Sequence, residues 1–244
     1  MRLGLQREIG ETGRHRGPSL AAVAGVYAIL VLVSVAVPTA MASGRHFPSP
    51  FDPGAPDWFA EYPSAALASA FLIFCSAVPL GIFTATASSR LQFLGMKVAG
   101  IHIALVGGVA ASVALATSAF AAWALAQAGG PDARAVAHAL HMFSFAAGGP
   151  GFVVPFGLLV AGVSVVAGLQ RFTPRWLMVA GLAIAAIAEL SVLTFVWPAA
   201  AILLPIVRFT GLLWMVGIGI VIPTSRAPRA QPAPIREASA GAAV

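Results

Sequence analysis

Long apolar runs, separated by short polar links, fill almost the whole chain. They lie at about residues 19–41, 63–87, 98–127, 135–170, 175–197 and 199–222. A helix needs about 20 apolar residues to cross a hydrocarbon core of about 30 Å. Within that core a helix satisfies its own backbone hydrogen bonds. The pattern therefore predicts an all-α, polytopic membrane bundle of six transmembrane helices.

The composition excludes a soluble domain. Charged residues make up only 9% of the chain and hydrophobic residues 59%, with a mean hydropathy of +0.91, whereas about a quarter of a soluble domain is charged. The six runs leave no room for a separate soluble domain. We expect a polar tail over residues 1–17, a six-helix transmembrane domain over 18–223 and a disordered Pro/Ala/Arg-rich tail over 224–244.

The basic residues indicate the orientation of the spans. Eleven of the fourteen Lys and Arg residues fall in the N-terminal tail, the 88–97 link, the 171–175 link and the C-terminal tail. Cytoplasmic loops are enriched in these residues, so both termini are predicted to be cytoplasmic. Nucleic acid is not an expected partner, because these charges are spread over loops and form no continuous stripe. The Arg- and Ala-rich composition favours a multi-pass protein of a bacterial inner membrane.

The fourth run is too long for one straight crossing. Its 36 residues would extend about 54 Å as a single helix. Gly148-Gly149-Pro150-Gly151 is the expected point of interruption, because glycine loosens a helix and proline removes a backbone donor. The sequence therefore predicts a discontinuous span, with residues 135–147 forming a separate or projecting piece on the non-cytoplasmic side.

Four tryptophans fall near the predicted ends of runs: Trp58, Trp123, Trp176 and Trp197. Indole rings favour the boundary between lipid and water. We expect all four at the membrane interfaces.

Two ionisable residues lie inside apolar runs and are candidates for function, because charges in hydrocarbon cost several kcal/mol. Glu189 lies nine residues before Pro198, and Arg208 lies ten residues after it. If the chain turns at Pro198, antiparallel helices would place both side chains at nearly equal depth. We predict that they pair. The pair could fix helix packing, or it could belong to a substrate or proton pathway.

His138 and His141 are three positions apart and so share a helix face. Two histidines can ligate a metal, but no nearby Cys or carboxylate completes a set, so no metal is predicted. Interfacial histidines bonded to water or backbone are expected here, with a polar cavity shared with Glu189 and Arg208 as the alternative. Haem would need axial histidines on facing helices, and His102 lies near the opposite end of its run. No cofactor is predicted.

The second half of the chain carries a recognisable pattern. LHMFSFAAGGPGFVVPFGLLVAG (140–162), RFTPRWL (171–177), LLPIVRFTGLLW (203–214) and the earlier PLGIFTATASSRL (79–91) resemble a bacterial family of small six-helix integral membrane proteins of unassigned function. The likeness covers roughly residues 79–226. It implies the six-helix topology and no catalytic residue.

These features favour a non-enzymatic membrane protein that binds a small or lipidic ligand, or a partner protein, through an outer-leaflet cluster of Glu189, Arg208, His138 and His141. One alternative is a small secondary transporter in which Glu189 titrates. Similar Val-Pro-x-Gly segments at 78–81 and 154–157 support it if they mark a duplicated hairpin rather than chance. A haem-bearing or redox-active subunit is a third possibility. The expected partners are the lipid bilayer and a membrane protein or a second copy of the chain.

The topology can be tested by cysteine labelling. A cysteine placed in residues 224–244 should be protected from a membrane-impermeant reagent in intact cells, because the basic residues retain this tail in the cytoplasm. Labelling from outside would contradict six spans with cytoplasmic termini.

Overall fold

The computed structural model describes residue 13, residues 15–128 and residues 133–225. Eight α-helices and two short 3₁₀ helices make up its regular structure. In chain order these are α1 (Leu20–Met41), α2 (Ala55–Glu61), α3 (Pro63–Phe93), α4 (Ala99–Gln127), α5 (Ala133–Gly148), α6 (Pro150–Leu169), α7 (Arg175–Leu190), η1 (Ser191–Phe195), η2 (Pro198–Ile202) and α8 (Leu203–Val221).

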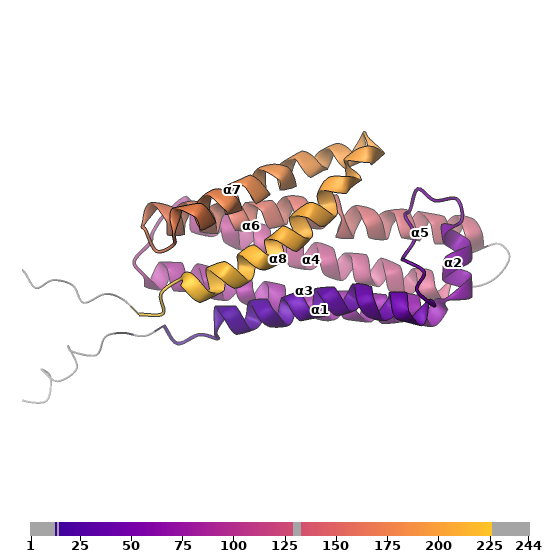
Figure 1. Cartoon of the computed structure of the whole chain (residues 1–244), viewed down its shortest axis with the longest axis horizontal. Coiled ribbons are helices and arrows are strands. Elements are labelled where there is room, and N and C mark those ends of the chain that lie inside the picture. Colours follow the sequence, from indigo (N-terminus) through magenta and orange to yellow (C-terminus); the bar gives the residue numbers. More distant parts are fainter. Residues whose placement is uncertain (1–12, 14, 129–132, 226–244) are drawn as a thin grey trace, which may run out of the picture.

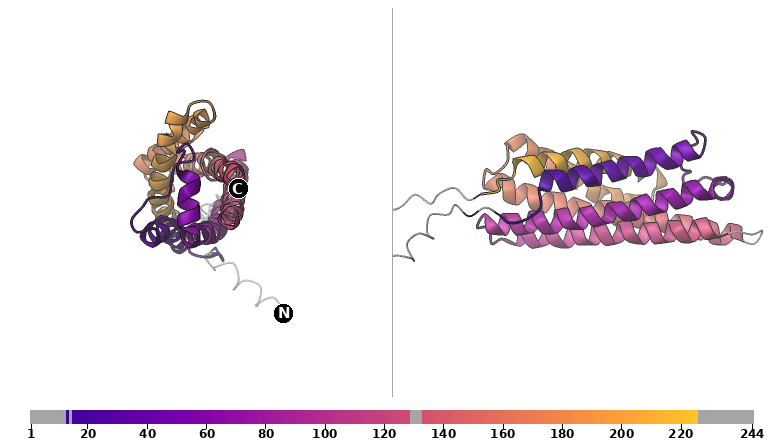
Figure 2. Two further views of the ribbon diagram at one scale, coloured as in Figure 1. Left: turned by 90° about the vertical axis from the view of Figure 1, so that its right-hand side faces the viewer. Right: turned by 90° about the horizontal axis from the view of Figure 1, so that it is seen from below.

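Six segments of this part of the chain are long and apolar enough to cross a membrane. The predicted six-helix transmembrane bundle is therefore confirmed. The spans are α1, α3, α4, α5 with α6, α7 with η1, and η2 with α8. Each packs against the next, and α8 returns to α1, so the six spans close into a ring (Figures 1 and 2).

The two ends of the bundle differ. The described chain begins and finishes at one end, beside the α3–α4 and α6–α7 links (Figure 1); we call this the terminal end. At the other end α2 crosses the bundle (Figure 2), and we call this the capped end. The α7–α8 hairpin stops short of the capped end, whereas α3, α4 and α5 continue past its tip (Figure 1).

Three of the four tryptophans lie near the ends of spanning helices. Trp123 lies in the last two turns of α4, and Trp197 lies at the α7–α8 tip. Trp176 lies in the first turn of α7, at the opposite boundary. These three indoles are 57%, 62% and 67% exposed, as expected for residues at an interface. The 31 residues of α3 extend about 46 Å and so exceed the apolar layer of the membrane, which is about 30 Å thick.

Trp58 does not fit the same prediction. It lies in α2 and is buried against the rings of Phe47, Phe59 and Tyr62. The polar stretch 43–62 contains the short helix α2. Asp52 accepts from the Gly54 N–H just before this helix, and Pro56 lies in its first turn. We call residues 43–62 the cap. Trp58 packs on the side of the cap that faces the bundle instead of facing lipid.

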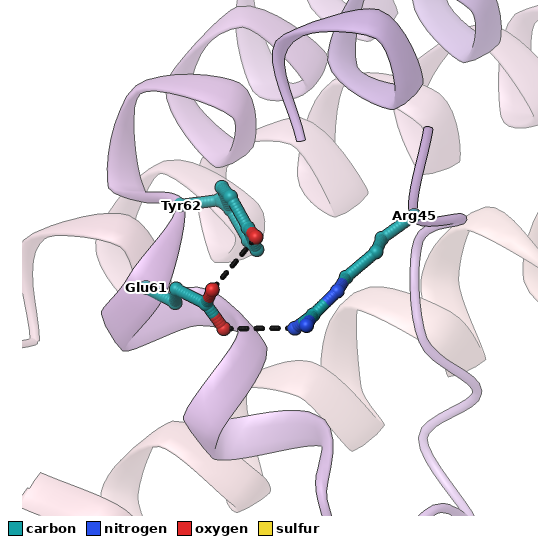
Figure 3. Close-up of polar contacts among 3 residues, drawn as sticks. All are labelled: Arg45, Glu61 and Tyr62. Atoms are coloured by element: carbon teal, nitrogen blue, oxygen red, sulfur yellow. Dashed lines mark hydrogen bonds and ion pairs between the residues drawn. The ribbon is translucent and has the colours of Figure 1, made fainter. Parts of the chain in front are cut away.

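Two ion pairs hold the cap. Arg45 donates to Glu61 over 2.9 Å, and Arg134 of α5 pairs with Asp57 of α2. The Tyr62 hydroxyl donates to the other Glu61 oxygen over 2.7 Å (Figure 3). This hydrogen bond raises the pKa of Tyr62 above its usual value. Because both ion pairs are exposed, each contributes at most about 1 kcal/mol, and the buried aromatic rings stabilise the cap more.

The centre of the bundle depends on a close approach of α4 and α6. A Cβ on Gly107 would lie 2.6 Å from the Pro155 carbonyl oxygen and 2.8 Å from the Leu159 nitrogen. A Cβ on Gly162 would lie 2.5 Å from the Gly100 carbonyl oxygen. Small residues of this kind let membrane helices pack backbone to backbone. This close packing sets the position of α6, the second half of the interrupted span, along α4.

We expect Gly107→Ala to destabilise the protein by about 1–3 kcal/mol, because the added methyl group would meet backbone atoms that cannot rotate away. Reversible unfolding in mixed detergent micelles measures this change. Gly25→Ala in α1 is the matched control, since a Cβ there would meet nothing within 4 Å. Equal losses in the two variants would contradict close α4–α6 packing.

Candidate functional site

The fourth span is interrupted at Gly149, as predicted. Gly149 lies between α5 and α6 with φ −88° and ψ −107°, and Pro150 begins α6. The Phe152 N–H, which would reach Gly148 in a continuous helix, donates instead to the Gly149 carbonyl over 3.1 Å. The Gly148 carbonyl is thus left without a backbone donor. A Cβ on Gly149 would lie 2.6 Å from the Phe145 oxygen, so only glycine fits this turn.

Arg208 of α8 supplies the missing donor. Its Nη2 donates to the Gly148 carbonyl oxygen. Its Cζ lies 5.0 Å from the centre of the Phe152 ring, within cation–π range. The guanidinium therefore joins α8 to both sides of the interruption.

The predicted pairing of Glu189 with Arg208 is wrong. Among the described residues only two ion pairs form, and both lie in the cap. Glu189 is exposed in the last turn of α7, and its Oε1 lies 3.4 Å from the place a Cβ on Gly157 would take. The prediction counted residues along two regular α-helices. η1 and η2 replace those helix ends, and their three-residue turns change both the rise and the facing of the chain.

Two serines hold α5 against α4 beside the interruption. The Ser118 hydroxyl donates to the Ser144 carbonyl over 2.8 Å, and the Ser144 hydroxyl donates to the Ser118 carbonyl over 3.0 Å. A Cβ on Gly148 would lie 2.4 Å from the Ser118 oxygen. These bonds fix the position of the Gly148 carbonyl. These two bonds could hardly be predicted from the sequence, because isolated serines in apolar helices commonly bond within their own turn.

The histidines of α5 lie apart from Arg208. His138 is exposed, whereas His141 is only 4% exposed and is enclosed by the edges of Phe47 and Phe59, at 5.8 and 4.8 Å between ring centres. The Nδ1 of His141 is buried without a hydrogen-bond partner among the described residues. The cap therefore covers His141, and its predicted bonding to water or backbone stays a prediction.

The four candidate residues do not form one cluster. His141 lies seven residues before Gly148 on α5, about 10 Å along the helix axis. Glu189 lies beside α6, and no ion pair links it to the described residues. His102 is exposed in the first turn of α4, at the terminal end. Within the described ranges no three His, Cys, Asp or Glu side chains are grouped to hold a metal ion.

No protein-family model matches the chain, and no curated protein or solved structure matches it either. The chemistry of the site must be read from Arg208. A guanidinium carries five N–H donors in a planar fork suited to carboxylate and phosphate, and Arg208 makes one hydrogen bond to the described residues. The chemistry of this side chain is therefore that of an anion ligand.

Replacing Arg208 by Met should destabilise the protein by about 1–3 kcal/mol, because the Gly148 carbonyl would lose its donor. Glu189→Gln should not lower the free energy of unfolding, because no described residue forms an ion pair with this carboxylate. The double variant should show the sum of the two effects. Unfolding in mixed micelles measures all three. If the double variant were more stable than Arg208→Met alone, the result would support an ion pair between Glu189 and Arg208 after all.

Proposed function

We propose that this multi-pass membrane protein binds an anionic amphiphile, whose carboxylate or phosphate pairs with Arg208 and whose chain lies along α8. One observation carries the proposal. Arg208 lies in a membrane-spanning helix, makes one hydrogen bond, and has no carboxylate of the described residues within ion-pair distance.

An unpaired arginine is costly in a membrane. Charged side chains within spans cost several kcal/mol and pair with other groups or line functional sites. A neutral carbonyl and an aromatic face offset part of this cost and leave the positive charge without a counter-charge. An anion from the surroundings would complete the site.

The neighbouring surface suits a hydrocarbon chain. Arg208 itself is only half-buried, and Ile206 and Phe209 beside it are each 42% exposed on α8. A ligand held by a charged group at Arg208 would keep its chain in contact with these residues and with lipid. This favours a lipid or fatty acid over a water-soluble anion.

The basic-residue pattern adds a location to this proposal. With cytoplasmic termini, the capped end lies outside the cell or in the periplasm, and the Arg208 site opens from the outer leaflet of a bacterial inner membrane. The chain would then take its ligand from the outer leaflet.

Glu189 favours a second candidate function, proton-coupled transport. Its carboxylate is exposed about 21 Å along α7, near the middle of the apolar layer, and no cation of the described residues pairs with it. A Glu189→Gln variant that keeps ligand binding but loses ligand movement across vesicles would support transport.

Binding at Arg208 can be tested by native mass spectrometry of protein purified with equal amounts of phosphatidylglycerol and phosphatidylcholine. Arg208→Gln should retain one phosphatidylglycerol fewer than the wild type, and Arg208→Lys should retain it in part, because the charge remains. Arg134→Gln, in the exposed cap, is the control and should retain all of it. If folded Arg208→Gln kept the wild-type number, the proposal would be wrong.

A further inference from the structure

The terminal end of the bundle contains a second arginine that forms no ion pair with a described residue. Arg90, in the last turn of α3, is only 3% exposed. Its Nη2 donates to the Pro18 carbonyl over 3.2 Å, and its Nε is buried without a partner among the described residues. A guanidinium can make five hydrogen bonds, so the described residues satisfy only part of its capacity.

The N-terminal segment covers Arg90. His15 contacts the Ser89 hydroxyl through Nε2 at 3.1 Å, and its ring meets the edge of Phe93 at 5.5 Å. The His15 N–H donates to the Thr224 carbonyl over 2.8 Å. Burial, and then the charge of Arg90, lower the pKa of His15. The segment thus places the imidazole of His15 near Arg90, which pairs with no carboxylate of the described residues.

Arg90 is not needed to cap its own helix. The last carbonyls of α3 already receive backbone donors, since the Leu94 N–H reaches the Arg90 oxygen, the Gly95 N–H reaches Gln92 and the Met96 N–H reaches Leu91. The helix dipole at this end is equivalent to about half a charge. This partial negative charge stabilises the Arg90 cation, but it is too small to neutralise it.

No carboxylate of the described residues lies within ion-pair distance of Arg90. Buried charges are ordinarily paired, because leaving one without its partner is strongly destabilising. The partner of Arg90 must therefore come from outside the described part of the chain. Arg90 lies where α3 ends, at the boundary of the apolar layer, and Lys97, Arg171 and Arg175 lie at the same end. Basic pockets between spans at such a boundary attract anionic headgroups.

We propose that Arg90, with His15 and Ser89 beside it, binds the phosphate group of an anionic phospholipid at the terminal end of the bundle. This site is separate from Arg208, which lies about 20 Å along α8 from its terminal end, and does not depend on it. The phosphate oxygens would accept from the free guanidinium donors, while the acyl chains remain in the bilayer beside α1 and α3. The ligand would also fix the N-terminal segment on the bundle.

The test uses full-length protein with a photoactivatable phosphatidylglycerol, followed by peptide mapping and native mass spectrometry. The wild type should crosslink near residues 15–19 or 88–93, and Arg90→Gln should lose this crosslink and one bound lipid while keeping the lipid at Arg208. Arg16→Gln is the matched control, because this exposed arginine lies in the same segment. A crosslink that persists in Arg90→Gln would overturn the proposal.

Three further measurements distinguish loss of lipid binding from loss of folding, and a lipid phosphate from other anions. Phosphatidylglycerol should raise the Tm of the wild type more than that of Arg90→Gln, each compared with its own lipid-free value, and Arg90→Lys should fall between them; equal shifts would overturn the site. Inorganic phosphate that raised the wild-type Tm without lipid, but not that of Arg90→Gln, would assign the site to a soluble phosphate instead. Glu8→Gln with Glu11→Gln should leave the bound lipid unchanged. A gain of lipid in that variant would show that these carboxylates hold the site.

Discussion

In a bilayer every backbone N–H and C=O must find a partner inside the protein, because the hydrocarbon core holds no water. This constraint organises the interrupted span. Pro150 has no N–H, Gly149 turns the chain, and the Phe152 N–H moves to Gly149, so the Gly148 carbonyl needs a donor from another helix. Arg208 provides it. This contact joins α8 to the end of α5.

The interruption also links the two halves of the structure. Toward the capped end, α5 is held to α4 by Ser118 and Ser144, and Phe145 packs on Phe51 of the cap. Toward the terminal end, α6 packs on α4 through Gly107 and Gly162. A change at Gly149 would thus affect the cap, the position of α8 and the packing of α4 on α6.

The spans and the interruption could be predicted from the sequence, because both depend on local quantities: the length of an apolar run and the chemistry of Gly and Pro. The contacts of Arg208 could not. They depend on a carbonyl that becomes available only when Phe152 changes its acceptor, and on two 3₁₀ segments that alter the facing of Glu189. The burial of His141 could not be predicted for a similar reason, since a cap built from residues 43–62 encloses it. Long-range covering of this kind leaves no periodic trace in a sequence.

Two arginines without carboxylate partners among the described residues lie at different heights of one bundle, and each makes a single hydrogen bond to a carbonyl. In both, the protein supplies part of the coordination and leaves donors free for an anion. Glu189 is separate from both and carries the opposite charge. The shared pattern favours recognition of an anionic lipid headgroup, because each guanidinium offers donors in a geometry suited to phosphate.

The most direct test of the account is an experimental density map of the protein in nanodiscs that contain phosphatidylglycerol. The account predicts that Arg208 lies between the Gly148 carbonyl and the headgroup of an elongated lipid density that follows α8. A map that showed the Glu189 carboxylate bonded to Arg208, with no lipid headgroup beside the guanidinium, would contradict it.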